Sequence, residues 1–274
     1  PFRREVLLDI KPIAKSKFIP ILTFSNDISL RENNIWSLGF SPEEQVESVI
    51  SCALSYGYKN FGLVAPDNLY GRILTNASID LISDYKNNKY DKILLNNNQI
   101  NNKSKLFSIL KSFLKFNENQ TLHTRFDSIL IGGSKEFILE IAPLLAFFNV
   151  DSKYVKILGT EKFNTKEIKN EPSLEKAWFP AIVSKNEKKF KLYWQKIWGD
   201  DVNYFSNAGF DSGNIGINYV NNQKDGSSFL KNISGPITGL TLKSGGYVKK
   251  PINVMQIESL GKLTNIKKCS NFKN

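Results

Sequence analysis

Short polar clusters follow several apolar runs in this sequence, and their side chains are the ones that could bind a ligand. The run Ile21–Phe24 ends in Ser25-Asn26-Asp27, and later runs end in Gly132-Gly133-Ser134 and Gly159-Thr160-Glu161. Hydroxyl, amide and carboxylate groups at the ends of buried strands are suited to hydrogen-bonding a small polar molecule. The alternative for each cluster is a simple exit turn, in which polar side chains bond their own backbone.

The sequence offers little for catalysis. It contains no G-x-S-x-G nucleophile elbow and no glycine-rich nucleotide fingerprint. The single histidine, His123, lies in the polar stretch NENQTLHTRF, which is typical of a surface loop. We therefore expect a protein that is not an enzyme, with no catalytic residues and no cofactor.

The sequence contains two cysteines, Cys52 and Cys269. No C-x-x-C or H-E-x-x-H motif is present, so we expect no metal site. Cys52 lies on the apolar stripe of a predicted helix, so we favour a buried thiol over a Cys52–Cys269 disulfide.

Helices and strands alternate along the chain. The clearest helix start is Ser41-Pro42-Glu43-Glu44, where Ser41 is the N-cap, Pro42 suits the first helical position and Glu44 completes a capping box. Gly57 supplies the C-cap of that helix. The other predicted helices cover residues 71–85, 106–116, 135–149, 186–198 and 207–220. The predicted strands cover residues 19–24, 35–40, 60–65, 92–95, 126–131, 155–158 and 177–183.

Strands separated by helices indicate an α/β fold with doubly wound parallel sheets. The Asn-rich residues 96–104 are predicted to be a loop, and the tail from Gly235 is predicted to form hairpins. In parallel sheets, ligands bind beyond the carboxyl ends of the strands, which is where the polar clusters lie.

The charge balance does not indicate nucleic acid. The net charge is +11, but lysines are spread along the whole chain among many Asn and Ile residues. Aromatic residues do not interleave with the lysines in a stacking platform. No apolar run approaches the ~18 residues of a membrane helix, so we expect no transmembrane segment.

Several motifs resemble those of type I periplasmic binding proteins, and the resemblance covers essentially the whole chain. They are, in order, IPILTFSND, LGFSPEEQ, YKNFGLVAPDNLYG, FDSILIGGS, ILGTEKF, AWFPA and AGFDSG. The resemblance is to the leucine-binding branch, and within it to the alphaproteobacterial proteins called penicillin-binding protein activators.

The resemblance implies two doubly wound parallel-sheet lobes with a ligand cleft between them. Residues 1–40 and 184–249 would form the first lobe, and residues 41–183 and 250–274 the second. Relatives open the first lobe with a βαβαβ run, and the first 20 residues here resemble the segment after it. We therefore expect the first lobe to lack that run, and an isolated chain to expose an apolar sheet edge.

The resemblance also implies a set of ligand-binding residues. Ser25 and Asn26 match the loop that binds a ligand carboxylate, and Ser41 matches a position that is often Asp in amino-acid binders. Tyr70 matches the tyrosine of the second-lobe YG motif. Ser134, Thr160 and Glu161 belong to second-lobe loops that face the cleft. The structural alternatives are a turn for Ser25, N-caps for Ser41 and Ser134, a packing aromatic for Tyr70 and a surface acid for Glu161.

Ser41 is an informative departure from the family pattern. A neutral hydroxyl does not pair with an ammonium group as a carboxylate does, so zwitterionic amino acids are not the favoured ligand. The expected function is binding a small polar molecule for transport or sensing, with an importer membrane complex as partner. The alternative is a regulatory partner of a peptidoglycan synthase. The expected location is the periplasm, with a lipid anchor on a preceding segment as one arrangement.

Overall fold

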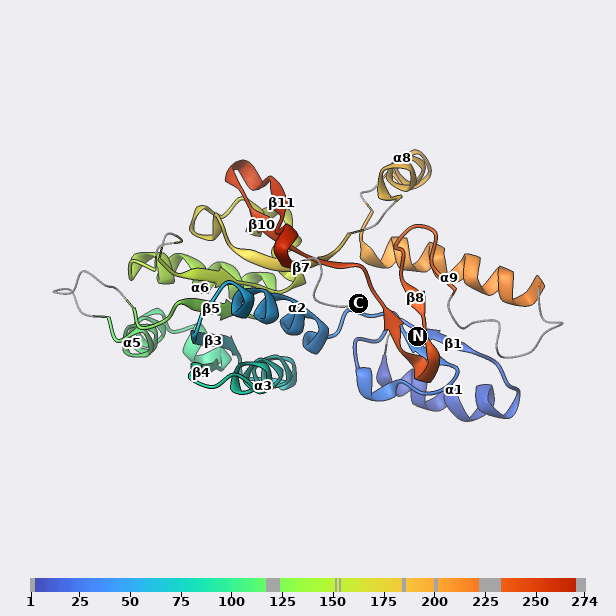
Figure 1. Ribbon diagram of the computed structural model, residues 1–274, viewed down its shortest axis with the longest axis horizontal. Coiled ribbons are helices and arrows are strands. Elements are labelled where there is room, and N and C mark those ends of the chain that lie inside the picture. Colours follow the sequence, from blue (N-terminus) through green and yellow to red (C-terminus); the bar gives the residue numbers. More distant parts are fainter. Residues whose placement is uncertain are drawn as a thin grey trace. The chain divides into compact units, whose positions relative to one another are not determined.

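The structure is a computed structural model that describes residues 3–116, 124–150, 152, 154–183, 186–199, 202–221 and 233–269. His123 therefore lies outside the described residues. The chain divides into two compact units, whose elements are labelled in Figure 1. Unit 1 comprises Pro1–Ser41 and Ile182–Ile252, and unit 2 comprises Pro42–Ala181 and Asn253–Asn274.

Unit 2 is built on a seven-stranded sheet of order β11-β10-β7-β6-β5-β3-β4. The strands are β3 (Asn60–Pro66), β4 (Lys89–Leu95), β5 (Ser128–Ile131), β6 (Lys156–Leu158), β7 (Trp178–Ile182), β10 (Ile252–Ile257) and β11 (Leu263–Asn265). The pairs β3–β4, β3–β5, β5–β6 and β6–β7 are all parallel. The parallel sheet predicted from residues 60–65, 92–95, 126–131 and 155–158 is thus confirmed.

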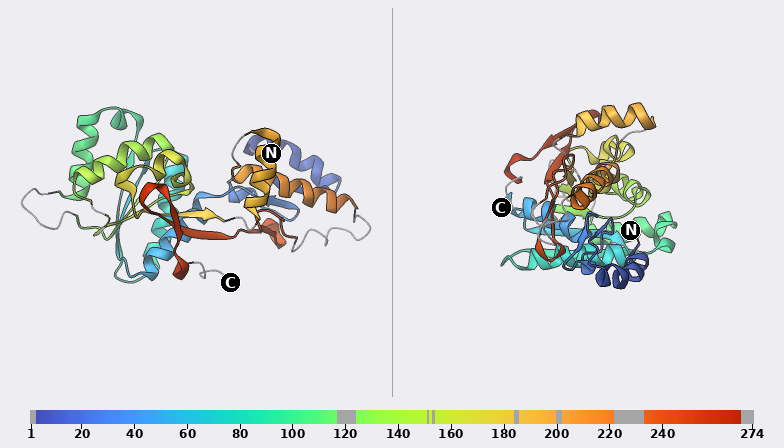
Figure 2. Two further views of the ribbon diagram at one scale, coloured as in Figure 1. Left: turned by 90° about the horizontal axis from the view of Figure 1, so that it is seen from above. Right: turned by 90° about the vertical axis from the view of Figure 1, so that its right-hand side faces the viewer.

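Helices cover both faces of this sheet (Figure 2, left). The longer ones are α2 (Pro42–Ser55), α3 (Leu69–Ser83), α5 (Lys103–Leu114) and α6 (Lys135–Phe147). Because successive strand residues point to opposite faces, Ile129 and Ile131 pack with α5 and α6, whereas Leu130 packs with α2 and α3. The continuous apolar runs in the sequence follow from burial on both faces.

The far edge of the sheet is antiparallel. β11 pairs with β10 in an antiparallel hairpin, as predicted for the tail. β10 in turn lies along β7, where the Lys176 N–H donates to the Ile257 carbonyl (2.7 Å) and the Val183 N–H to the Pro251 carbonyl (3.1 Å).

Unit 1 contains helices and two small sheets. Its helices are α1 (Arg4–Ser16), α8 (Glu187–Trp198) and α9 (Tyr204–Asn221). β1 (Ile21–Thr23) and β2 (Ile35–Ser37) are parallel, and β8 (Thr241–Leu242) and β9 (Val248–Lys249) form the second predicted hairpin. The buried Asp211 of α9 holds the turn before β8, because its carboxylate accepts the Ile237 and Thr238 N–H groups (both 2.8 Å).

Two predictions of local structure need correction. The Asn-rich stretch 96–104 is not one loop: it holds the short helix α4 (Asn97–Ile100) and the start of α5. Asn96 and Gln99 form a reciprocal capping box, and the Asn102 side chain caps α5 through the Lys105 N–H (3.0 Å). Asparagine supplies the N-cap oxygens here. β1 and β2 are also shorter than the predicted strands 19–24 and 35–40. After β1 the chain turns at Ser25, whose hydroxyl accepts the Asp27 N–H.

The prediction for the cysteines is wrong. Cys52 of α2 and Cys269 of η7 (Lys267–Cys269) form a disulfide across 217 residues of sequence. Burial was predicted correctly for Cys52, which is fully buried. The apolar stripe of a helix indicates burial but carries no information about a distant partner.

Candidate functional site

The carboxyl ends of β3, β5 and β6 lie at one edge of the unit 2 sheet, because these strands are parallel. The loops that leave this edge begin at Asp67, Gly132 and Gly159. These loops and the helical turns that follow them carry four of the predicted ligand-binding residues, which are Tyr70, Ser134, Thr160 and Glu161. Such an edge is where doubly wound sheets bind ligands.

Tyr70 is positioned by the start of α3. The Asn68 side chain caps this helix by accepting the Gly71 N–H (2.9 Å). A Cβ atom on Gly71 would lie 2.0 Å from the Pro66 carbonyl oxygen, so only glycine permits this close approach of helix and strand end. The YG pair of the sequence therefore places the tyrosine next to the end of β3.

The Tyr70 phenol is held in its neutral form. Burial raises its pKa to about 12, the charge of Glu161 acts in the same direction, and a contact with the Thr160 hydroxyl opposes both. The phenol therefore keeps its proton at physiological pH and can donate a hydrogen bond.

Thr160 contributes a buried hydroxyl. The residue is fully buried, and its oxygen makes no hydrogen bond of good geometry in the part of the chain that is described. The Thr160 hydroxyl nevertheless lies close enough to the Tyr70 phenol to lower its pKa. A buried hydroxyl without a good partner is costly, so Thr160 is suited to bond a ligand.

Glu161 is tied to the first turns of α2. Its N–H donates to the buried Gln45 side-chain oxygen (3.0 Å), which joins the loop after β6 to this helix. Its carboxylate is about one-third exposed and pairs with Lys162 (3.1 Å). The structure therefore brings Tyr70, Thr160 and Glu161 together, with Gln45 beside them.

Ser134 is an N-cap, as its structural alternative predicts. Its hydroxyl accepts the Phe137 N–H at the start of α6 (3.3 Å). The residue is exposed and lies on a groove of about 520 Å³ that also touches Pro66, Asn68 and Asn97. A second hollow shares these last three residues. Ser134 thus lies at the same sheet edge, in a groove lined by amide, charged and apolar side chains.

Ser25 and Asn26 follow β1 in unit 1. Ser25 is buried in local bonds: its carbonyl accepts the Ser37 hydroxyl, and its own hydroxyl accepts the Asp27 N–H (3.2 Å). A Cβ on Gly39 would lie 2.3 Å from the Ser25 carbonyl oxygen, so the LGF motif packs backbone on backbone here. These contacts are the ones expected if Ser25 belongs to a simple exit turn, in which polar side chains bond their own backbone. Asn26 itself is exposed.

Ser41 is fully buried and lies just before α2. Sequence reasoning missed Gln45 and Asn68 as positioning residues. Both stand in quoted motifs, LGFSPEEQ and YKNFGLVAPDNLYG, but nothing in the sequence connected Gln45 to the loop after β6.

No group of three or more His, Cys, Asp or Glu side chains that could hold a metal ion occurs among the described residues. Within the same residues, the helices are too short or too polar to span a membrane.

No family model matches the chain, and no curated protein matches it. Solved structures do. A leucine-binding protein from Thermotoga maritima has a TM-score of 0.70 at 15% identity, over 97% of this chain and 77% of that protein. A branched-chain amino acid transporter ligand-binding protein from Burkholderia xenovorans has a TM-score of 0.74 at 13% identity, over 100% and 78%. A solute-binding protein from R. palustris with bound benzoate has a TM-score of 0.68 at 12% identity, over 97% and 75%. The chain therefore has the type I periplasmic-binding-protein fold.

Proposed function

We propose that the chain is a non-enzymatic solute-binding protein of the cell envelope, which holds a small polar molecule for transport or sensing. The observation that carries this proposal is the cluster of Tyr70, Thr160 and Glu161 at the carboxyl edge of a type I periplasmic-binding fold. The structural neighbours support it, because they are named as binding proteins of importers. Ser25, Asn26, Ser41 and Ser134 stay predicted members of the site.

The cluster favours a ligand with polar hydrogens and lone pairs. Tyr70 offers a donor, the Thr160 hydroxyl offers both functions, and Glu161 accepts. A small hydroxylated or amino-bearing molecule satisfies all three groups. The periplasm is the proposed location, because a buried disulfide is typical of proteins in oxidising compartments. Lipid anchoring stays a prediction.

The regulatory alternative, a penicillin-binding-protein activator that binds a peptidoglycan synthase, rests on the sequence resemblance and on the neutral Ser41. The structural neighbours described here give it no support.

The test is a thermal-shift screen of the purified chain against amino acids, amides, small hydroxy and aromatic acids, and muropeptides. A ligand that binds only the folded state raises the melting temperature by mass action. We expect at least one compound of low molecular mass to do so. A second measurement asks whether the immobilised chain binds a peptidoglycan synthase. If it does, and no compound raises the melting temperature, the regulatory alternative replaces the proposal.

For the compound that binds, Thr160→Val is the informative variant. It keeps the shape of the side chain and removes the hydroxyl, and losing a bond to a desolvated ligand group costs about 1–3 kcal/mol. Binding should therefore weaken about five- to 150-fold, measured by calorimetry.

Ser128→Ala is the matched control. Ser128 also has a fully buried hydroxyl without a partner in the described structure, but it lies at the amino end of β5, on the opposite edge of the sheet. Its removal should leave affinity unchanged. Equal affinities for the two variants would exclude Thr160 from the site.

A further inference from the structure

The C-terminal segment Lys262–Cys269 is held on unit 2 by hydrogen bonds and by two partly buried apolar side chains. β11 pairs with β10 over three residue pairs, and the Ile266 N–H donates to the Val254 carbonyl (2.9 Å). The Glu258 N–H donates to the Lys262 carbonyl, and the Thr264 hydroxyl donates to the Glu258 carboxylate (both 2.7 Å). Leu263 and Ile266 pack against the edges of the two cores of unit 2. Most of its side chains are exposed, and Cys269 is its one buried residue. A segment that buries little apolar surface opens readily when nothing else holds it.

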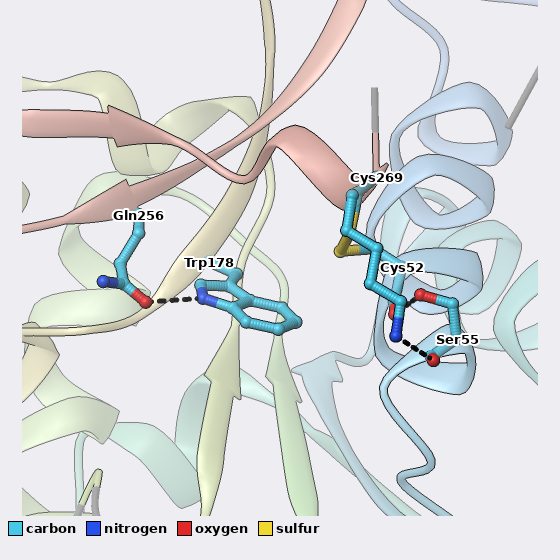
Figure 3. Close-up of a disulfide and its surroundings, with 6 residues drawn as sticks. Cys52, Ser55, Trp178, Gln256 and Cys269 are labelled. Atoms are coloured by element: carbon cyan, nitrogen blue, oxygen red, sulfur yellow. Dashed lines mark hydrogen bonds between the residues drawn. A yellow bond between two sulfur atoms is a disulfide. The ribbon is translucent and has the colours of Figure 1, made fainter. Parts of the chain in front are cut away.

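The disulfide is the covalent attachment of this segment. It joins Cys269 to Cys52 in the last turn of α2, and both residues are buried (Figure 3). Lys268 reinforces the attachment, because its ammonium group donates to the Ser55 carbonyl (3.0 Å) and lies 4.6 Å from the centre of the Tyr56 ring.

The same region connects β7 and β10 to the end of α2. The Trp178 indole N–H on β7 donates to the Gln256 side chain on β10 (2.8 Å), as Figure 3 shows. The Trp178 ring also meets the Tyr56 ring edge-on, with centroids 4.8 Å apart, at the end of α2. Through these contacts α2, β7, β10 and the C-terminal segment form one cluster.

These elements have a special place in the topology. The chain passes between the two units after Ser41, after Ala181 and near Ile252. The unit 2 elements that carry these three passages are α2, β7 and β10. The cluster therefore binds together the three elements next to the passages.

We propose that the Cys52–Cys269 disulfide is a lock that fastens the C-terminal segment over these three elements and makes them a single body. The lock closes when both thiols pass two electrons and two protons to the disulfide of an oxidant, by thiol–disulfide exchange. The oxidant's disulfide becomes a dithiol, and the Cys52 and Cys269 sulfurs become bonded to each other.

The test compares the oxidised chain with the Cys52→Ala/Cys269→Ala variant by hydrogen exchange. We expect amides of residues 262–269 to exchange at least about tenfold faster in the variant. Amides of β3 and β5 in the middle of the sheet should change less than about twofold. Lys267→Ala, at an exposed position of the same segment, keeps the disulfide and is the control; it should resemble the unsubstituted chain.

Any of the following results would overturn the lock. Unchanged exchange in residues 262–269 would show that non-covalent contacts suffice. Equal acceleration throughout unit 2, or failure of the variant to fold, would show that the disulfide stabilises the whole unit and not this segment. Free thiols detected by mass in protein purified from an oxidising compartment would contradict it as well.

Discussion

Lys156 shows how one residue in unit 2 responds to two opposing effects. Its ammonium group lies 4.8 Å from the centre of the Trp178 ring and donates to the Lys176 carbonyl (2.9 Å), and both contacts favour the charged form. Burial nevertheless lowers its pKa to about 8, and the neighbouring Lys176 charge adds to this, against a smaller effect of Glu258. Desolvation therefore decides the direction of the shift.

A pH dependence of stability follows from that shift. The pKa of a lysine in an unfolded chain is about 10.4. Between about pH 8 and 10.4 the folded state has released a proton that the unfolded state still binds, so the free energy of unfolding should rise with pH. In Lys156→Met the free energy of unfolding should rise less steeply with pH, because up to about one proton fewer is taken up on unfolding.

Urea unfolding at a series of pH values measures that slope. Lys92→Met, at an exposed position on β4, is the control and should keep the slope of the unsubstituted chain. Because Lys156 is partly solvent-accessible, screening reduces the size of the effect. Parallel stability curves for Lys156→Met and the unsubstituted chain would disprove the assignment.

At the scale of elements, the junction between β3 and α3 is the most sterically constrained part of the candidate site. In Gly71→Ala the new methyl group meets the Pro66 carbonyl oxygen, a backbone atom that cannot rotate away. We expect a loss of about 1–3 kcal/mol in the free energy of unfolding and weaker solute binding, because Tyr70 moves with the helix.

Gly213→Ala in α9 is the control for Gly71→Ala, because it adds the same methyl group to a helix. Nothing lies within 4 Å of the Cβ position there, so alanine should stabilise the helix by about 0.5–1 kcal/mol. Chemical denaturation of both variants tests the pair. A Gly71→Ala chain as stable as the Gly213→Ala chain would contradict the close approach.

The elements also show what sequence can and cannot predict. β3, β5 and β6 were predictable because strands buried on both faces are continuous apolar runs. Gly57, with φ of +90°, and Ser134 were predictable as caps from local chemistry. The Gln45 contact with Glu161 and the Cys52–Cys269 bond were not, because 116 and 217 residues separate the partners. The polar cluster after an apolar run indicated Thr160 and Glu161 as candidates, whereas the resemblance assigned Tyr70 to the site with them.

At the scale of the molecule, apolar exposure is uneven. Large apolar side chains of unit 1 remain exposed on three helices. They include Ile13 of α1 (61% exposed), Leu192 and Trp198 of α8 (71% and 65%), and Ile217 and Val220 of α9 (63% and 65%). Patches of this kind promote association.

We therefore expect the 274-residue chain to self-associate as its concentration rises and to bind a hydrophobic dye at its native state. Light scattering across a concentration series measures the association. Lowering salt is a useful control, because a net charge of +11 opposes association more strongly when it is less screened. A monomer at all concentrations, with a cooperative melt and no dye binding, would show this expectation to be wrong.

The wide separation of Cys52 and Cys269 in the sequence has a consequence for biosynthesis. During synthesis from the amino end, Cys52 emerges 217 residues before its partner and cannot form this bond until Cys269 has followed. In that interval two nascent chains could join through their Cys52 thiols. The emergence of Cys269 is thus the step at which unit 2 becomes covalently closed.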